Sequence, residues 1–129
     1  MISDINPEGG SYPWDFLRIN PLYFSADDGT NGRELWISDR TTGGTFMVDI
    51  CPGACSSDPS YLTNVNGTLF FRANDVTNGY ELWKSDGTLA GTVMVKDINP
   101  GGSSYPYDLT NVNGTLFFQA YDVLNGYEL

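Results

Sequence analysis

Apolar and polar residues alternate in short runs along the chain, and turn-forming pairs separate the runs. Residues 68–73 place Leu69, Phe71 and Ala73 on one face of an extended segment that directly follows Asn66-Gly67. Asn-Gly between two such runs is the strongest short-range signal of a β-hairpin. Runs of the same kind occupy residues 61–65, 80–85 and 92–98. Because no segment has the apolar spacing of a helix, the pattern predicts an all-β fold of short antiparallel strands.

Apolar residues lie on both faces of these expected strands. Phe70 and Trp83 alternate with Phe71 and Leu82, so neither face of the sheet is polar. A sheet in a two-layer sandwich has one face in water, whereas a blade of a β-propeller packs on both faces. The pattern therefore favours propeller blades over a sandwich, and a solenoid of stacked repeats is the remaining alternative.

One pattern occurs three times along the chain. The motif Gly-x-Glu-Leu begins at Gly32, Gly79 and Gly126, which are 47 residues apart, and residues 56–82 and 103–129 are identical at 21 of 27 positions. A period of about 40–45 residues is typical of one four-stranded propeller blade. The sequence therefore predicts a single repeat domain, 1–129, with repeats 1–47 and 48–94 and a truncated repeat 95–129.

These repeats amount to about two and three-quarter blades, whereas propeller rings typically have about four to eight. Two arrangements would complete a ring. Either two copies of the chain assemble, or the chain is a piece of a longer polypeptide, and we expect the second slightly more than the first.

The second repeat resembles a known bacterial repeat. The string from Glu81 to Thr88, Glu-Leu-Trp-Lys-Ser-Asp-Gly-Thr, followed by Gly91-Thr92, is similar to the ELW-x-x-D-G-T repeat, and residues 95–101 resemble the linking segment of that family. Such repeats occur in large secreted or surface-associated bacterial proteins that sometimes carry a hyalin-like label. The resemblance implies a β-propeller-like, extracellular and non-enzymatic role, and it supplies no catalytic residues.

Charge narrows the classes of partner. The chain of 129 residues has a formal net charge of −10 and only six basic residues. Nucleic acids and anionic lipids need basic patches, so neither is expected as a partner. No apolar run approaches the about 18 residues that a membrane helix requires. Residues 1–4 lack the features of a signal peptide, so the signal of an exported protein would lie outside this chain.

Catalysis has little support in the sequence. The chain contains no histidine, which excludes a Ser/His/Asp triad and a histidine-based metal site. Paired carboxylates are able to serve a glycosidase, but the acids recur in every repeat, whereas an active site is normally unique. We therefore expect a protein that is not an enzyme.

Cys51 and Cys55 flank a Pro-Gly turn that can bring their sulfur atoms together. A local disulfide is the favoured interpretation in an oxidising compartment, and two free thiols are the main alternative. A metal site is disfavoured because the pair lacks a histidine or a second pair of cysteines.

Each repeat also has an acidic turn in which an aspartate, an asparagine and a glutamate follow at intervals of three. Carboxylate and amide oxygens at this spacing are able to bind Ca²⁺, the one cofactor that the sequence suggests. The favoured alternative is that Asp and Asn stabilise a β-turn through the backbone. The residues are Asp28, Asn31 and Glu34, then Asp75, Asn78 and Glu81, then Asp122, Asn125 and Glu128.

Aromatic residues beside carboxylates recur in a loop of each repeat. Sugars bind to such pairs, because their apolar faces stack on rings while acids accept hydroxyl hydrogen bonds. The alternative, which we favour, is that the rings pack between blades. The candidate binding residues are Tyr12, Trp14, Asp15, Tyr61, Tyr105, Tyr107 and Asp108.

The sequence thus predicts a non-enzymatic binding or structural scaffold, a propeller-type segment of a secreted or cell-surface bacterial protein. One alternative is a carbohydrate-binding, lectin-like propeller that uses the aromatic and acidic loops. The other is a self-assembling subunit whose sheet edges pair with another copy. The expected partners are therefore further copies, the rest of a longer chain, or glycans.

Overall fold

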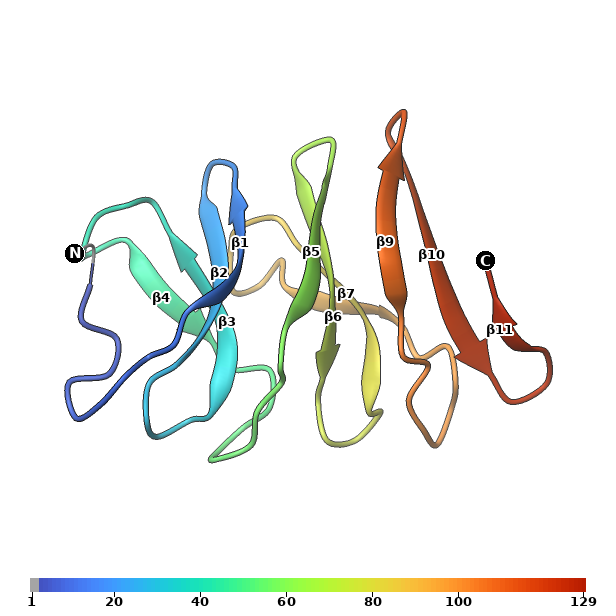
Figure 1. Ribbon diagram of the computed structural model, residues 1–129, viewed down its shortest axis with the longest axis horizontal. Coiled ribbons are helices and arrows are strands. Elements are labelled where there is room, and N and C mark those ends of the chain that lie inside the picture. The colour runs from blue at the N-terminus through green and yellow to red at the C-terminus, as the bar shows by residue number, and fades with distance from the viewer. Residues whose placement is uncertain (1–2) are drawn as a thin grey trace.

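The computed structural model describes residues 3–129, which form eleven β-strands in three antiparallel sheets and no helix (Figure 1). The first sheet consists of β1 (Trp14–Arg18), β2 (Leu22–Asp27), β3 (Arg33–Ser38) and β4 (Thr45–Val48). The second consists of β5 (Ser60–Val65), β6 (Thr68–Asn74), β7 (Tyr80–Ser85) and β8 (Val93–Lys96). The third consists of β9 (Tyr107–Val112), β10 (Thr115–Asp122) and β11 (Gly126–Glu128). The predicted all-β fold is confirmed.

Neighbouring strands in each sheet follow one another along the chain. The registers of the first two sheets correspond, since Phe24 pairs with Trp36 and Phe71 pairs with Trp83. The first strands of the three sheets, β1, β5 and β9, lie side by side (Figure 1). Residues that begin these three strands are therefore brought together from distant parts of the sequence.

The core fills the space between the first and second sheets. Leu69, Phe71 and Ala73, the face predicted from the alternation in β6, are buried there. Tyr23, Leu35 and Ile37 of the first sheet belong to the same cluster, and Trp83 packs against it. Burial of apolar surface at this junction is the main stabilising contribution that the fold offers.

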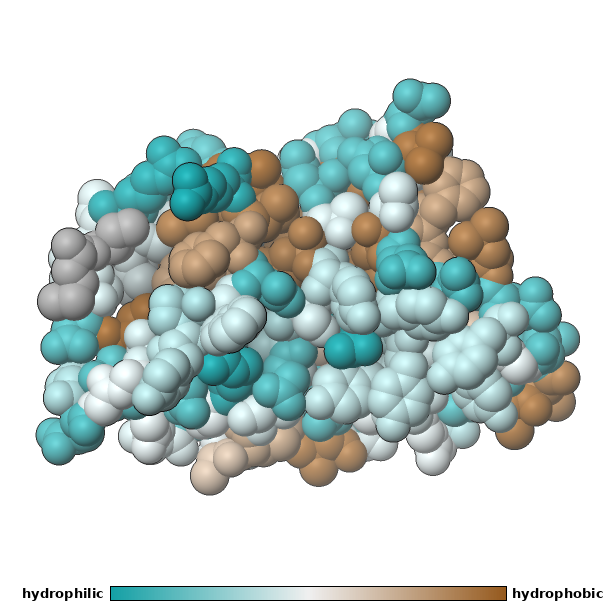
Figure 2. Space-filling view, in the orientation of Figure 1, coloured by the Kyte–Doolittle hydropathy of each residue, from teal (hydrophilic) through white to brown (hydrophobic). Residues whose placement is uncertain are grey.

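The third sheet is much less covered. Its positions Val112, Phe117 and Tyr127 are exposed, and so are Val123 and Leu124 in the turn before β11. Apolar residues gather at this end of the molecule in the space-filling view (Figure 2). The described chain therefore has one sheet with a substantial apolar surface in water.

The fourth strand of the second sheet is shorter than predicted. Residues 92–98 were expected to be extended throughout, but β8 ends at Lys96. The N–H of Ile98 donates instead to Glu81 Oε2, at 3.1 Å. A carboxylate in the neighbouring strand thus takes a backbone donor that a longer ladder would have used.

A polar turn after β7 accounts for the Ser-Asp-Gly-Thr string. Asp86 Oδ1 accepts hydrogen bonds from the N–H and the hydroxyl of Thr88, while the Thr88 hydroxyl accepts from the N–H of Gly91. Thr92 donates to the carbonyl of Thr88 and shares a hydrogen bond with Ser85. Asp39 and Thr41 make the same bonds after β3, and these bonds lower the pKa of the Asp39 and Asp86 carboxyls. The repeated string is therefore explained by turn stability alone.

Within residues 3–129 the structure has no helix with the length and apolarity that crossing a membrane would require.

Candidate functional site

Equivalent loops lead into the first strand of each sheet, and their backbones share an unusual conformation. Tyr12, Asp58 and Tyr105 each precede a proline and have φ angles of 40°, 46° and 46°. Positive φ is uncommon for residues other than glycine, and it marks strain that the surrounding structure must hold in place. Each loop is fixed by the carbonyl of the preceding serine, which accepts a hydrogen bond from the second strand of the sheet that follows.

A second residue with positive φ lies in a β-bulge three positions further along each loop. Asp15, Tyr61 and Asp108 have φ angles of 49°, 59° and 54°, and the strand register shifts beside each of them. Bulges re-aim side chains and are frequent beside binding sites. All three residues line one cavity of about 580 Å³, together with Thr63 and Thr110. The fold therefore brings these three predicted binding residues to one place.

The predicted aromatic residues divide into exposed and packed ones. Tyr12 and Trp14 are 69% and 68% exposed. Tyr105 stacks on Tyr80 with ring centroids 5.7 Å apart, and the hydroxyl of Tyr107 donates to Gln119. The rings of the third loop thus contact neighbouring strands, whereas those of the first loop are available to a ligand.

A smaller cavity of about 320 Å³ lies at the junction between the first and second sheets. Trp14 lines it, as do two residues that sequence reasoning missed, Arg33 and Arg72. The available signal was that Arg33 stands where the later repeats have tyrosine, at positions 80 and 127. Residues that differ between the repeats, such as Arg33 and Arg72, meet at this junction only because the fold places the two sheets side by side.

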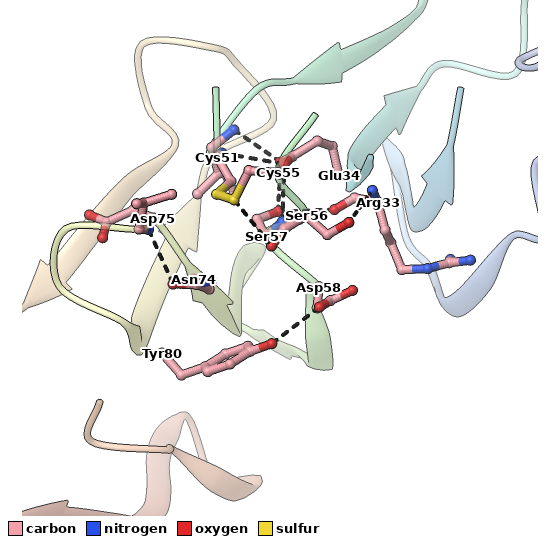
Figure 3. Close-up of a disulfide and its surroundings, with 12 residues drawn as sticks. Arg33, Glu34, Cys51, Cys55, Ser56, Ser57, Asp58, Asn74, Asp75 and Tyr80 are labelled. Carbon is pink, nitrogen blue, oxygen red and sulfur yellow. Dashed lines mark hydrogen bonds between the residues drawn. A yellow bond between two sulfur atoms is a disulfide. The ribbon is translucent and has the colours of Figure 1, made fainter. Parts of the chain in front are cut away.

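Glu34 and Glu81 hold the segments that connect successive sheets. Glu34 is fully buried, and its carboxylate accepts hydrogen bonds from the N–H groups of Ile50, Cys51 and Ser57. The hydroxyl of Ser57 donates to it at 2.6 Å. Figure 3 shows this cluster around the Glu34 carboxylate. Burial raises the pKa of Glu34 to about 7, although the four hydrogen bonds act in the opposite direction.

The second connecting segment is held in the same way. The Glu81 carboxylate accepts hydrogen bonds from the N–H of Ile98 and from the N–H and hydroxyl of Ser104. Glutamate from one sheet and serine from the start of the next are thus paired at both connections. In contrast, Glu128 is exposed in β11.

The acidic turns have the geometry of self-contained β-turns. Asp28 accepts hydrogen bonds from the backbone N–H and the side-chain amide of Asn31, both at 2.7 Å, and these bonds lower the pKa of Asp28 against the effect of its burial. The pairs Asp75 with Asn78 and Asp122 with Asn125 repeat this arrangement. The carboxylates of Glu34 and Glu81 are engaged elsewhere, with the connecting segments. In the first two predicted calcium triads the glutamate is therefore directed away from the aspartate and asparagine of its turn, and within residues 3–129 no cluster of three acidic or cysteine side chains is arranged for a metal.

Cys51 and Cys55 are joined by a disulfide in the first connecting segment (Figure 3). Cys51 is fully buried beside the Glu34 carboxylate. In the second connecting segment, the side-chain amide of Asn99 donates to the carbonyl of Ser103 at 3.1 Å, and this bond closes the corresponding turn. The turn in the first connecting segment is thus closed by a disulfide, and the turn in the second by a hydrogen bond.

The chain matches no protein-family model, no curated protein and no solved structure.

Proposed function

We propose that the chain is a non-enzymatic scaffold of β-propeller type, a repeat segment of a secreted or cell-surface bacterial protein that presents its loops for binding. The observation that carries this proposal is the side-by-side arrangement of β1, β5 and β9, each entered through the same strained loop. In a propeller the first strands of successive blades surround the axis in this manner. The cavity of about 580 Å³ between these strands corresponds to the channel in this interpretation.

The exposed surface of the third sheet supports a need for further blades. Val112 and Phe117 occupy positions of β9 and β10 whose counterparts in the second sheet, Val65 and Phe70, are better covered. An uncovered apolar sheet face is a site for association, because its burial releases water from apolar surface. The blades that cover it would belong to a second copy of the chain or to the rest of a longer polypeptide.

Carbohydrate is the class of ligand that the loops favour. Trp14 and Tyr12 present large rings to solvent next to Asp15, which lines the axial cavity. Ring faces and carboxylates in this proximity suit saccharides, whose rings are apolar on one face and carry hydroxyl donors at their edges. Calcium is not needed in this proposal, because hydrogen bonds within the acidic turns already engage their carboxylates.

A screen of the protein against immobilised neutral and acidic glycans tests the binding role. We expect binding that Trp14→Ala weakens about tenfold. Tyr107→Ala should weaken it less, because Tyr107 already packs against Gln119 and Tyr127. Circular dichroism would show that both variants keep their sheet content. Failure to bind any glycan would contradict the binding role.

Light scattering over a range of concentrations tests the need for further blades. We expect a discrete dimer if two copies complete a ring, and concentration-dependent association through the third sheet if a longer chain supplies the remaining blades. A monomer that remains monomeric at high concentration, with Phe117→Ser leaving its solubility unchanged, would contradict the proposed association.

A further inference from the structure

The junction between the first two sheets gathers two of the six basic residues of this acidic chain around one cavity. Arg33 at the start of β3 and Arg72 in β6 line it, together with Trp14 and the two aspartates Asp15 and Asp58. The cavity has a volume of about 320 Å³, which is at the lower end of the range for small-molecule sites. Asp15 lines both this cavity and the larger cavity between β1, β5 and β9, so the two are neighbours.

Both guanidinium groups are held in place by hydrogen bonds to uncharged acceptors. Arg33 Nη1 donates to the carbonyl of Tyr12 at 2.9 Å and to Ser25 Oγ at 3.3 Å. Arg72 Nε donates to Ser60 Oγ at 3.1 Å. Arg33 Nη1 also donates to the carbonyl of Ser25 at 3.5 Å, so the hydrogen bonds of both arginines within residues 3–129 go to hydroxyl and carbonyl oxygens.

Aromatic rings further restrict Arg72. Its guanidinium carbon lies 4.9 Å from the ring centroid of Tyr61 and 5.2 Å from that of Tyr80. The hydroxyl of Tyr80 in turn donates to Asp58 at 3.1 Å, a contact that Figure 3 shows. A charged donor that is positioned before a ligand arrives loses less conformational entropy on binding.

The next junction of the same chain shows what the repeat does without a cavity of this kind. The residues 47 positions after Arg33 and Asp58 are Tyr80 and Tyr105, whose rings stack at a centroid distance of 5.7 Å. A stacked aromatic pair thus occupies the second junction where the first has a separated cation and anion. Where Arg33 and Asp58 replace the two tyrosines, the packed aromatic contact is replaced by a cavity with charged walls.

We infer that this junction binds a sugar that carries a carboxylate, such as a uronic acid residue of an acidic polysaccharide. Guanidinium groups bind carboxylates through paired N–H donors, and Arg33 and Arg72 supply such donors. The exposed ring of Trp14 offers a stacking surface for the apolar face of the sugar, and the carboxylate of Asp58 accepts from its hydroxyls. A densely charged polyanion is disfavoured because the net charge of the chain is −10. This inference rests on the proposed binding role and specifies its ligand.

Isothermal titration calorimetry with trimers of galacturonic, glucuronic and mannuronic acid, each compared with its methyl ester, tests the assignment. We expect at least one acid to bind, and its ester, which lacks the charge, to bind about tenfold or more weakly. The double variant Arg33→Tyr with Asp58→Tyr reproduces the residues of the second junction and should lose binding. It should remain folded, since the chain already packs this pair elsewhere.

Two control variants locate the effect. Arg18→Gln removes an exposed guanidinium that does not line the cavity, and Leu89→Ala removes an exposed apolar side chain in the turn after β7, outside the cavity wall. Both should bind within about twofold of the wild type, whereas Trp14→Ala should bind about tenfold more weakly. Urea unfolding would verify that every variant is folded.

Each outcome bears on a different claim. If the acid and its ester bind equally, or if the double variant binds like the wild type, the carboxylate site at this junction is wrong, while a glycan-binding scaffold stands. If uronic acids do not bind but neutral glycans do, the ligand class is wrong. If no saccharide of either kind binds, the proposed binding role fails with it.

Discussion

Replacement of Glu34 by glutamine should remove a defined pH dependence from the stability of the protein. Burial raises the pKa of this carboxyl from 4.5 to about 7 in the folded chain. The folded state therefore holds the proton more tightly than the unfolded state. The resulting contribution to stability is fully present below pH 4.5 and is lost as the pH rises through about 7.

The magnitude follows from the two pKa values. The difference between 4.5 and about 7 corresponds to about 3 kcal/mol, of which about 2.5 kcal/mol changes between about pH 5 and pH 8. Glutamine keeps the shape of the side chain but does not titrate. Its amide nitrogen also places a donor against the N–H groups of Ile50, Cys51 and Ser57, so at least one of these buried groups loses its acceptor, at a cost of about 1–3 kcal/mol.

Urea unfolding of wild type and Glu34→Gln across this pH range measures both effects. The stability advantage of the wild type should shrink by about 2.5 kcal/mol from about pH 5 to pH 8. Comparing the two proteins cancels every other titrating group. Glu128→Gln, which removes an exposed glutamate from the same motif, should leave the pH profile nearly unchanged. A wild-type advantage that stays constant with pH, or that grows as the pH rises, would refute the reasoning.

Three further substitutions probe the turns and the connecting segments. Gly32 and Gly126 have φ angles of 74° and 82°, but a Cβ at Gly32 would collide with the carbonyl of Cys55, whereas nothing lies within 4 Å of one at Gly126. Gly126→Ala should therefore lower the free energy of unfolding only by the backbone penalty of about 1 kcal/mol. Gly32→Ala should lower it several times more, as measured by urea unfolding. Equal losses of stability would show that the connecting segment moves away from the added Cβ without an energetic penalty. Thr92→Val should lower the free energy of unfolding by about 1–3 kcal/mol, because the buried hydroxyl of Ser85 and the carbonyl of Thr88 lose their hydrogen-bond partner. Thermal or urea unfolding measures this loss. An unchanged unfolding midpoint would mean that the hydrogen bonds of this turn do not contribute to stability.

Local pattern was sufficient to predict β6 and the turn before it, whereas the end of β8 was predicted wrongly. The alternation of Leu69, Phe71 and Ala73 identified the buried face of β6, and Asn66-Gly67 identified the hairpin that precedes it. These features depend on residues that are close in sequence, where the period of a strand and the preferences of a turn act directly.

The role of Glu34 depended on contacts that the sequence does not display. Its spacing from Asp28 suggested a shared metal, but its partners Ile50 and Ser57 are 16 and 23 residues away. The cavity between Arg33 and Arg72 required the placement of one sheet against another. Differences between the repeats, rather than their shared motif, were the signal that pointed to this junction.

The pairing of Glu34 with Ser57, and of Glu81 with Ser104, has an evolutionary consequence. At both boundaries the glutamate comes from the third strand of the earlier unit and the serine from the loop that opens the later one. Gene duplication or unequal recombination that adds or removes a whole unit therefore preserves a matched donor and acceptor at each new boundary. Such a chain can gain or lose a whole unit and keep these hydrogen bonds, while the residues beside them are free to differ, as Arg33 and Asp58 differ from Tyr80 and Tyr105 at the next boundary.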